Sequence, residues 1–551
     1  MYWIIFDISL ILLMFFSSMY FGIRYKKASE KSFKSYFTAD GELSFSVLTG
    51  TLMSTFFSGV VIIGFGGKAA DSGIVMWIGS LGLIYVMRYP IYIVAQAARN
   101  KFPEGVYTLP DFCEFYYGKT TGGLAALLNL AYNLVRYSTQ MLTVATLLRV
   151  IFGINLVHGL IIAAIILLFY TMLAGIWGVA ISGLVYSIVM CLGTGLACFY
   201  IFRKVGGFDG LTPLLDAATW DPLGGKSLGY WISAMIGIGM SQWCAPELYQ
   251  RFISGKNTKI TTYAWCWTVF IWVVFAACVG IPGLVARALY SGIPGDDGVI
   301  KVYLTILPGG LRGLWISSLL AATLSTASSH ILLAGTNISK DLYYNLFNSK
   351  IPENRLIFIT RVSILFLGFL AIFIALKFES VFDIYLWGQW FMTAGLLIII
   401  PGTLLWPGKV SKYSGLPTML VGILTFLLMS EPIGFLEKNV AIMLAWISSL
   451  IVFIAINLFK REGIVTFKND IFNKKEFWQK DYDMKVIILG FILVVLFTLG
   501  YMVSPLKQFK FDLYFYLTSI ITVLMGIVLL VAFLIDYKII KVKKKSNLNQ
   551  P

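Results

Sequence analysis

Residues 321–330 read Ala-Ala-Thr-Leu-Ser-Thr-Ala-Ser-Ser-His, a run of small and hydroxyl-bearing side chains inside an otherwise apolar chain. At helical spacing, Ala322, Ser325 and Thr326 share one face. That face offers two hydroxyl oxygens and a backbone carbonyl, the hard oxygen ligands that small alkali and alkaline-earth cations prefer. Small polar residues also mediate close helix packing in lipid. Taken alone, the stretch favours a role in helix packing over a cation site. The rest of the sequence favours the cation site instead.

The composition is that of an integral membrane protein. Of 551 residues, 58% are hydrophobic and 13% are charged, with a mean hydropathy of +0.82, whereas soluble domains carry about 25% charged residues. Apolar runs of about 20 residues predict membrane-spanning helices. We therefore expect an all-α integral membrane protein with about fifteen transmembrane helices. These are expected near 3–23, 45–67, 74–98, 122–150, 156–176, 180–202, 229–250, 262–287, 312–340, 355–378, 383–405, 415–431, 438–459, 484–503 and 513–536.

The formal charge of +16 indicates membrane orientation rather than nucleic-acid binding. Basic residues gather after the first, seventh, ninth, eleventh and thirteenth predicted spans and at the chain's end, all on one side of the membrane if the helix count holds. The positive-inside rule then predicts a multi-pass protein of the plasma (inner) membrane, with the N-terminus outside and the C-terminus in the cytoplasm. A basic tail of this kind also predicts contact with anionic membrane lipid. We expect no nucleic-acid partner.

Two predicted spans are interrupted at mid-membrane depth. The second span carries Ser-Thr-Phe-Phe-Ser-Gly at 54–59, and the seventh carries Gly-Ile-Gly-Met-Ser-Gln at 237–242. Irregular backbone at this depth is tolerated only where it is buried in protein or lines a cavity. Glycine is also simply frequent in membrane helices, but the matching positions of the two interruptions favour genuine breaks.

Each interrupted span opens a block of five predicted helices, and this is the pattern of an inverted-repeat transporter with its site at the midplane. The two repeats would cover residues 45–202 and 229–405. Residues 1–44 would form a first peripheral helix and a cytoplasmic loop. Residues 406–551 would form peripheral C-terminal helices and a basic cytoplasmic tail.

Several segments resemble the sodium/solute symporter family, which includes proline, pantothenate, sugar and sialic acid carriers. The likeness covers residues 35–410, in the family's order and spacing. The matching segments are Ser35-Tyr36-Phe37-Thr38-Ala39, Thr108-Leu109-Pro110-Asp111-Phe112, Tyr170-Thr171 with Gly175, Gln250-Arg251 with Lys256, and the 321–330 stretch continued to Asp341-Leu342-Tyr343. The last two predicted spans look like an addition to the family's thirteen-helix form.

This resemblance implies a LeuT-type core with a 5+5 inverted repeat and a sodium site between the second and ninth predicted helices. The implied ligands are the carbonyls of Ser54, Phe57 and Ala322 and the hydroxyls of Ser325 and Thr326.

Family members with a second sodium site place an acid on the sixth helix, where this chain has Gly183 after Ser182. Those members use that acid together with hydroxyls that match Ser325, Ser328 and Ser329. Because the acid is missing here, we expect one Na⁺ and regard a second Na⁺ as doubtful.

Ionisable residues at membrane depth are functional hypotheses by default. In the family's sugar carriers, the positions of Tyr132 and Arg136 face the substrate cavity, and a guanidinium there suits a carboxylate, which it can hold through two hydrogen bonds. The alternative is an internal pair of Arg136 with an acid such as Glu247. We interpret His330 as a packing residue rather than a proton carrier. The predicted substrate-binding residues are Ser58, Arg88, Tyr132, Arg136, Gln242 and Glu247.

These observations predict a sodium-coupled symporter that imports a small polar organic solute by alternating access. The favoured solute is a carboxylate such as an acidic sugar or an organic acid. The alternatives are a proton-coupled or non-transporting sensor of the same fold, or a multi-span membrane enzyme. The last would need a cluster of catalytic polar residues, and the sequence has no His-Glu-x-x-His motif and only two histidines. We therefore expect a transporter, not an enzyme.

Overall fold

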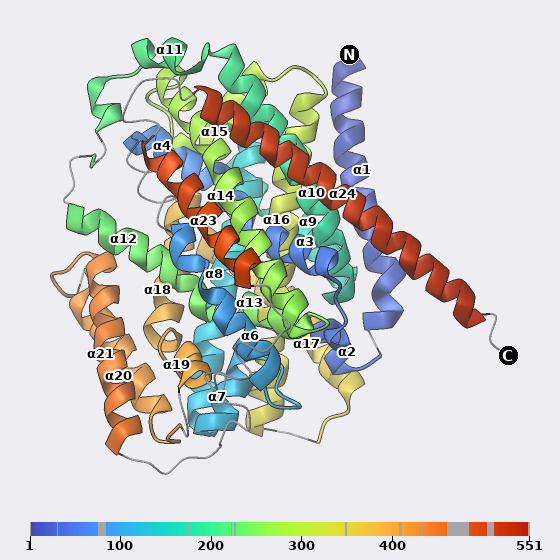
Figure 1. Ribbon diagram of the computed structural model, residues 1–551, viewed down its shortest axis with the longest axis vertical. Helices are drawn as coiled ribbons and strands as arrows, with labels where there is room; N and C mark the ends of the chain where they lie inside the picture. The colour runs from blue at the N-terminus through green and yellow to red at the C-terminus, as the bar shows by residue number, and fades with distance from the viewer. Residues whose placement is uncertain are drawn as a thin grey trace.

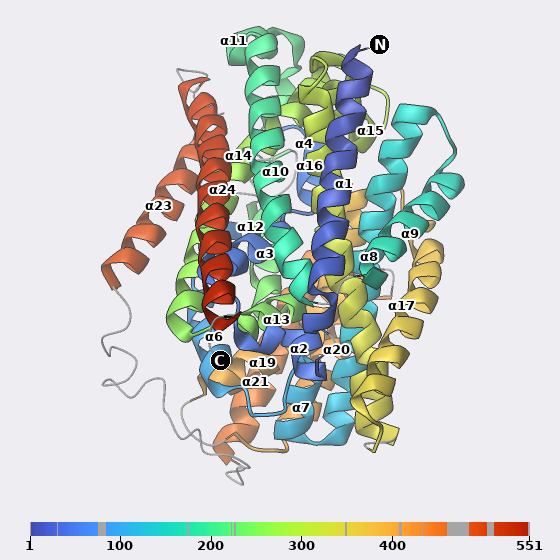
Figure 2. The same cartoon turned by 90° about the vertical axis from the view of Figure 1, so that its right-hand side faces the viewer.

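The described part of the chain is helical throughout. The computed structural model describes residues 2–29, 31–74, 84–173, 176–221, 223–224, 228–347, 350–406, 410–431, 433–459, 484–503 and 512–548. Within these ranges the only β-structure is two isolated bridges. Most of the long helices lie side by side along the long axis of the molecule (Figures 1 and 2). The predicted all-α class is confirmed for this part of the chain.

The first half of the chain forms ten α-helices among the described residues. They are α1 (Tyr2–Ser29), α2 (Phe33–Thr38), α3 (Phe45–Phe56), α4 (Phe65–Ser72), α6 (Ile91–Lys101), α7 (Leu109–Tyr117), α8 (Lys119–Phe152), α9 (Leu156–Leu173), α10 (Ile176–Lys204) and α11 (Gly207–Leu211). The π-helix η2 (Val60–Gly64) leads into α4, and the 3-10 helices are η1 (Ala39–Gly41), η3 (Thr212–Leu214) and η4 (Ala217–Trp220).

The second half supplies the remaining described helices. They are α12 (Leu228–Met240), α13 (Pro246–Ser254), α14 (Thr258–Leu289), α15 (Gly295–Ile306), α16 (Leu311–Thr336), α17 (Glu353–Ala375), α18 (Val381–Leu396), α19 (Ile399–Leu405), α20 (Gly415–Met429), α21 (Lys438–Phe459), α23 (Met484–Val503) and α24 (Asp512–Leu548). The 3-10 helix η5 (Ser241–Cys244) separates α12 from α13, and the π-helix η6 (Asn337–Phe347) continues α16.

Membrane-spanning candidates are identified here by length and composition. Among the described residues, six helices are long and apolar enough to cross a membrane, or up to eight if each of two bent helix pairs forms one span. Four further apolar helices are shorter. The expected fifteen spans therefore stay a prediction. Residues 75–83 of the third predicted span, and 460–483 with their basic residues, lie outside the described residues.

The second predicted span is broken where the sequence indicated. Helix α3 ends at Phe56, and the segment Val60–Ser72 continues at an angle of 50° to it. The freed backbone at the break is paired by a neighbouring helix, because the Gly59 N–H donates to Gln140 Oε1 of α8 (3.2 Å). Glycine is required here, since a Cβ on Gly59 would lie 2.4 Å from Thr143 Cγ2. The break is thus buried in protein, as irregular backbone in a membrane must be.

The seventh predicted span is also interrupted. After α12, the chain passes through η5 and an extended Ala245 before Pro246 opens α13. A proline suits the first position of a helix, because its missing N–H would have no partner there. The sequence did not predict a third irregularity, the 46° bend between α18 and α19.

The two ends of the molecule carry different connecting segments. Helices α11 and α15 and the N-terminus lie at one end, and α2 and α7 lie at the opposite end (Figure 2). In the predicted topology, the segments around α2 and α7 share the cytoplasmic side, and α11 and α15 lie outside. The structure agrees with this grouping, and the end that faces the cytoplasm stays a prediction.

Helices at the two ends of the chain pack against the central ones. On α1, Asp7 Oδ1 accepts hydrogen bonds from the N–H groups of Gly310 (2.6 Å) and Gly313 (2.9 Å) at the start of α16. Helix α24 packs against α10 through small residues, since a Cβ on Gly526 would lie 2.9 Å from Cys191 Cβ. Helix α23 packs against α14 (Figure 1).

Candidate functional site

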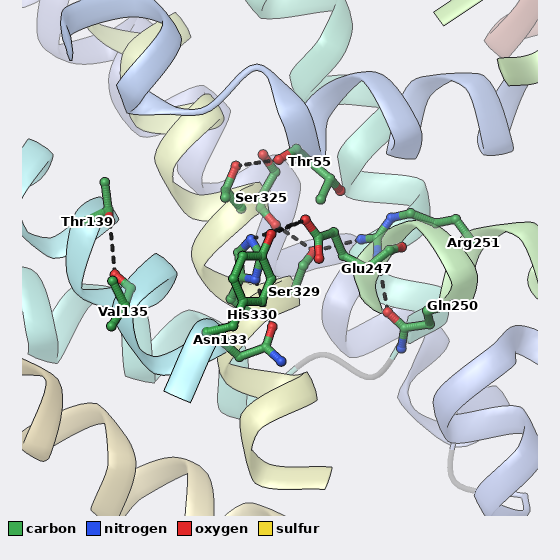
Figure 3. Close-up of polar contacts among 12 residues, drawn as sticks. Thr55, Asn133, Val135, Thr139, Glu247, Gln250, Arg251, Ser325, Ser329 and His330 are labelled. Carbon is green, nitrogen blue, oxygen red and sulfur yellow. Dashed lines mark hydrogen bonds and ion pairs between the residues drawn. The ribbon is translucent and has the colours of Figure 1, made fainter. Parts of the chain in front are cut away.

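The hydroxyl-rich stretch of α16 faces the end of α3 (Figure 3). Ser325 Oγ lies 2.6 Å from the carbonyl oxygen of Ser54 and 3.0 Å from that of Ala322. Thr326 Oγ1 lies 2.9 Å from the carbonyl oxygen of Ala322 and 3.0 Å from that of Thr55. The one proton of each hydroxyl is shared between the two carbonyls in its reach. All five residues are at most 1% exposed. Three carbonyl oxygens and two hydroxyl oxygens therefore meet in one buried cluster, called the oxygen cluster below.

The break in α3 explains why these carbonyls are available. Because α3 ends at Phe56, the carbonyls of its last turn lack the N–H groups that a continuing helix would supply. Ser54 and Thr55 lie in that turn, and α16 supplies hydroxyls to their carbonyls. On α16 itself, Ser325 and Thr326 follow Ala322 by one turn, so both hydroxyls reach its carbonyl.

Four of the five predicted sodium ligands, Ser54, Ala322, Ser325 and Thr326, are thus brought together. The fifth, Phe57, sits at the break, where its ring packs on Phe275 with 4.0 Å between ring centroids; its carbonyl stays a predicted ligand. The Thr55 carbonyl was missed by the sequence reasoning, although its place in the interrupted segment was a usable signal.

The oxygen cluster fits a sodium ion chemically. Its donors are neutral hydroxyl and carbonyl oxygens, which are hard ligands. No thiol, imidazole or carboxylate belongs to the cluster, so its five residues favour a singly charged hard cation over a transition metal.

Gly183, where the resemblance implied an acid in members with a second sodium site, lies directly against this cluster. Gly183 of α10 approaches Ser54 so closely that a Cβ on it would lie 2.7 Å from Ser54 Oγ. Its neighbour Ser182 is engaged elsewhere, with its hydroxyl 2.7 Å from that of Tyr170.

A guanidinium occupies the other side of the same region of α16. Ser329 Oγ accepts a hydrogen bond from Arg251 Nη2 (2.6 Å) and donates to the Ser325 carbonyl (2.8 Å). Arg251 Nη1 donates to the Glu247 carbonyl (3.1 Å) and to Gln250 Oε1 (3.1 Å). Arg251 is fully buried. A fixed positive charge therefore lies beside one of the hydroxyls that could serve a second cation.

Two arginines converge on one small cavity. The cavity measures about 20 Å³, which is room for about one water molecule. It lies at the α3 break and at η5, so both interrupted helices contribute to it. Its polar lining comes from Ser58, Arg88, Arg136 and Gln242, and its aromatic lining includes Tyr85, Trp272 and Tyr385.

Both arginines have donors without partners. Arg136 is 1% exposed, its guanidinium lies over the Tyr385 ring (4.4 Å to the ring centroid), and its Nε and Nη1 atoms have no hydrogen-bond partner. Arg88 is 7% exposed; Nη2 donates to the Ile238 carbonyl (3.3 Å), and Nε has no partner. Within the described part of the chain, no carboxylate lies within ion-pair distance of Arg136. The alternative of a direct Arg136–Glu247 pair is therefore not what this conformation shows.

Glu247 and Tyr132 form a second polar cluster. Tyr132 donates to Glu247 Oε1 (2.8 Å), and His330 Nε2 lies 4.0 Å from the same oxygen atom. Glu247, Tyr132 and His330 have no exposed surface. Neither Glu247 Oε2 nor His330 Nε2 has a hydrogen-bond partner. The predicted substrate residues thus divide into four that line the cavity and two that lie in this neighbouring cluster.

A chain of side chains leads from His330 toward α7. His330 Nδ1 lies 2.9 Å from Asn133 Oδ1, Asn133 Nδ2 lies 3.4 Å from Asn337 Oδ1, and Asn337 donates to Asp341 (2.7 Å). Thr108, the N-cap of α7, donates to the other oxygen of Asp341 (2.6 Å). The sequence reasoning missed Asn133, Asn337 and the cavity residue Tyr385, because their types and spacing gave no signal.

Comparisons with known proteins agree with this geometry. A family model described as the sodium:solute symporter family matches residues 36–422. The osmoregulated proline transporter OpuE of Bacillus subtilis is 25% identical, over 72% of this chain and 84% of the relative. The sodium/glucose cotransporter of Vibrio parahaemolyticus is 22% identical, over 71% of this chain and 78% of the relative.

Solved structures show the same fold. The substrate-bound, outward-open state of a Na⁺-coupled sialic acid symporter matches with a TM-score of 0.68 and 17% identity, covering 83% of this chain and 98% of that one. MhsT in complex with L-phenylalanine matches with a TM-score of 0.50 and 14% identity, covering 75% of this chain and 97% of that one.

Proposed function

The chain belongs to the sodium:solute symporter family, and from this premise we propose that it imports a small organic carboxylate together with one sodium ion. The observation that carries the choice of a carboxylate is the cavity at the two helix breaks, where buried guanidinium donors of Arg88 and Arg136 have no partners. A buried charge without a partner costs several kcal/mol. An anionic solute would supply that partner, and an acidic sugar or an organic acid has the required group.

In this proposal the oxygen cluster binds the sodium ion. The ligands are the carbonyls of Ser54, Phe57 and Ala322 and the hydroxyls of Ser325 and Thr326, and the Thr55 carbonyl is a further candidate. A bound cation would take over carbonyls that now accept hydrogen bonds from the two hydroxyls. The hydroxyl protons would then turn away from the ion.

A single sodium ion is favoured for two reasons. Gly183 supplies no carboxylate beside Ser54 and leaves little space for one. Arg251 already places a positive charge on Ser329, and a second cation nearby would be repelled by it.

The solute would bind where Ser58, Arg88, Arg136 and Gln242 line the cavity, with Tyr132 and Glu247 behind them. A cavity of about 20 Å³ is too small for a sugar or an amino acid. Solute binding therefore requires the helices around it to separate, as alternating access demands.

At the scale of the whole chain, we propose a LeuT-type core of two five-helix repeats, 45–202 and 229–405, within about fifteen spans. The protein would lie in the plasma (inner) membrane with its N-terminus outside. Its basic C-terminal tail would contact anionic lipid in the cytoplasm.

Uptake into proteoliposomes tests the proposal most directly. Radiolabelled sialic acid, proline and glucose, with a panel of small organic acids, would be offered with and without an inward sodium gradient. We expect uptake of at least one carboxylate that depends on sodium, and none of glucose. Sodium-driven uptake of glucose alone would overturn the carboxylate assignment, and carboxylate uptake independent of sodium would overturn the coupling.

A further inference from the structure

In place of the packing role that the sequence favoured for His330, we propose that Glu247 and His330 form a buried proton-binding site, and that its proton moves with the solute. The second part rests on the proposed transport function, whereas the binding of a proton by this pair does not. Glu247 lies on α13, and His330 lies on α16, the helix that also carries Ser325 and Thr326 of the oxygen cluster (Figure 3).

The hydrogen-bond network fixes which nitrogen of His330 is free. Asn133 Nδ2 donates to the Asn129 carbonyl (2.8 Å) and faces Asn337 Oδ1, so its amide oxygen is the atom turned to His330. An amide oxygen only accepts, and therefore Nδ1 of His330 carries the hydrogen. In the neutral ring, Nε2 then presents a lone pair.

That lone pair faces another acceptor. Glu247 Oε1 lies 4.0 Å from His330 Nε2 and accepts its one hydrogen bond from Tyr132 (2.8 Å). Neither Nε2 nor the second carboxyl oxygen, Oε2, has a donor, and both residues have no exposed surface. Two buried acceptors that face each other lack one hydrogen. A proton added to either atom would turn the contact into a charge-assisted hydrogen bond after an approach of about 1 Å. The proton would come from solution when the cavity opens to one side, and it would leave when the cavity opens to the other.

The surrounding charges link this proton to the solute. The titratable and charged groups that act on His330 are Arg136 and Tyr132 of α8 and Glu247 and Arg251 of α13. With Glu247 ionised, the two guanidinium groups leave one excess positive charge around the site. A carboxylate bound to Arg136 would cancel it, so proton binding and carboxylate binding should strengthen each other reciprocally.

The amide groups beyond His330 orient the ring and do not conduct the proton. Asn133 and Asn337 connect His330 to Asp341, but an amide has no proton that it exchanges readily. We therefore assign them as positioning residues. The proton path is the solute path.

Nitrogen NMR on the full-length chain in lipid nanodiscs tests the proton site without any solute. The chain has two histidines, and the exposed His158 gives an internal reference. In the wild type we expect the ring hydrogen of His330 on Nδ1. As the pH is lowered, a second hydrogen should appear on Nε2, and Glu247→Gln should prevent this.

Two cavity variants give the matched comparison. Arg136→Gln removes a charge that acts on the pair, so the fraction of His330 protonated on Nε2 at a given acidic pH should rise several-fold. Arg88→Gln removes a charge from the same cavity that is not among the groups acting on His330, and it should behave as the wild type does. If Arg136→Gln does not fold, Glu247→Gln against the wild type still decides the question.

The proposed proton site would be overturned if the ring hydrogen of His330 stood on Nε2 at every pH. It would also be overturned if Nε2 became protonated in Glu247→Gln as it does in the wild type. The role in transport is judged separately, in proteoliposomes that contain a pH-sensitive dye. Uptake of a transported carboxylate should acidify the lumen in the wild type and not in Glu247→Gln. Sodium-coupled uptake without acidification would refute proton coupling while leaving the proposed function intact, and absence of any uptake would refute the proposed function instead.

Discussion

The hydroxyl of Ser325 has two partners that belong to different helices. It joins the end of α3, through the Ser54 carbonyl, to its own helix, through the Ala322 carbonyl. A net hydrogen bond of this kind contributes about 1 kcal/mol to stability. The same oxygen atom is also the proposed sodium ligand, so its loss should affect ion binding far more than folding.

Ser325→Ala should raise the sodium concentration needed for half-maximal uptake many-fold, because it removes one direct oxygen ligand. Ser328→Ala is the matched control, since the Ser328 hydroxyl donates to the Ser325 carbonyl (3.1 Å) and is not a ligand. Initial uptake rates measured against sodium concentration give the comparison. An unchanged sodium dependence in Ser325→Ala would show that the ion binds elsewhere.

Arg136 permits a test of substrate charge by substitution. Arg136→Lys keeps the charge but loses the planar fork that holds a carboxylate, so binding should weaken sharply. Arg136→Gln should impair carboxylate uptake far more than binding of a neutral analogue. Thermal shift with the solute panel, in the presence of sodium, checks this because ligands stabilise the state that binds them. If only neutral sugars or polyols raise the melting temperature, the carboxylate assignment fails.

The broken helices show how much of the site a sequence can specify. Polar residues and glycine at 54–59 and 237–242 indicated both interruptions, and the structure has breaks there. The partner of the α3 break was not predictable, because Gln140 reaches Gly59 from a segment distant in sequence. The bend after α18 was missed because no cluster of polar residues marks it. Local chemistry indicated Ala322, Ser325 and Thr326 as oxygen donors, and the family resemblance added Ser54 and Phe57. Tertiary packing brings Arg88 and Arg136 to one cavity.

Gly59 tests the packing of the α3 break. A Cβ on it would meet Thr143 at 2.4 Å, so Gly59→Ala should lower the thermal midpoint of the detergent-solubilised protein and reduce uptake. Gly237→Ala is the control at the other interrupted helix, where the nearest atom to a new Cβ is 4.0 Å away. It should be neutral or stabilising, by up to about 1 kcal/mol, because alanine favours the helix. Equal effects of the two substitutions would contradict this account.

A pH dependence of stability is predicted for Asp296 of helix α15, which lies at the end of the molecule opposite α7 (Figure 2). Asp296 at its start accepts a hydrogen bond from the Val381 N–H at the start of α18 (3.0 Å), and burial raises the pKa of Asp296 from 3.8 to about 7. Because its carboxyl group ionises less readily in the folded protein, its contribution favours the folded state at low pH. That contribution is lost as the pH rises from about 4 to about 7.

Thermal unfolding across that range measures the effect. The Asp296→Asn variant should lose this part of the decline in melting temperature. Asp297→Asn, at the neighbouring acid paired with Arg149 (2.6 Å), should keep most of it, because burial and not the charge of Asp297 is the main cause of the raised pKa of Asp296. If the melting temperature of Asp296→Asn falls with rising pH as that of the wild type does, Asp296 is not the cause of the decline.

At the scale of the whole molecule, two packed helices lie outside the residues that the family model matches. The family model ends at residue 422, yet α23 and α24 pack against α14 and α10 of the central bundle. The sequence predicted these two helices but not their position, because an apolar helix gives no sign of which neighbour it covers. The basic residues along the chain predict its sidedness, and the side that faces the cytoplasm stays a prediction.

At this scale we predict a stoichiometry of one sodium ion per solute. Sodium dependence of uptake should give a Hill coefficient near one, and reversal potentials should give the same ratio. A ratio of two would mean that other oxygen donors compensate for Gly183 and that Arg251 moves away from Ser329.

The contact between α10 and α24 also sets an order of events during synthesis. Gly195 and Gly526 hold the two helices close, but more than 300 residues separate them in the chain. Synthesis runs from the N-terminus, so α10 is made before α24, and the face of α10 that includes Cys191 lacks its packing partner until α24 has been made. A nascent chain that stops after α21 would carry its family signature complete and its bundle still open on that face.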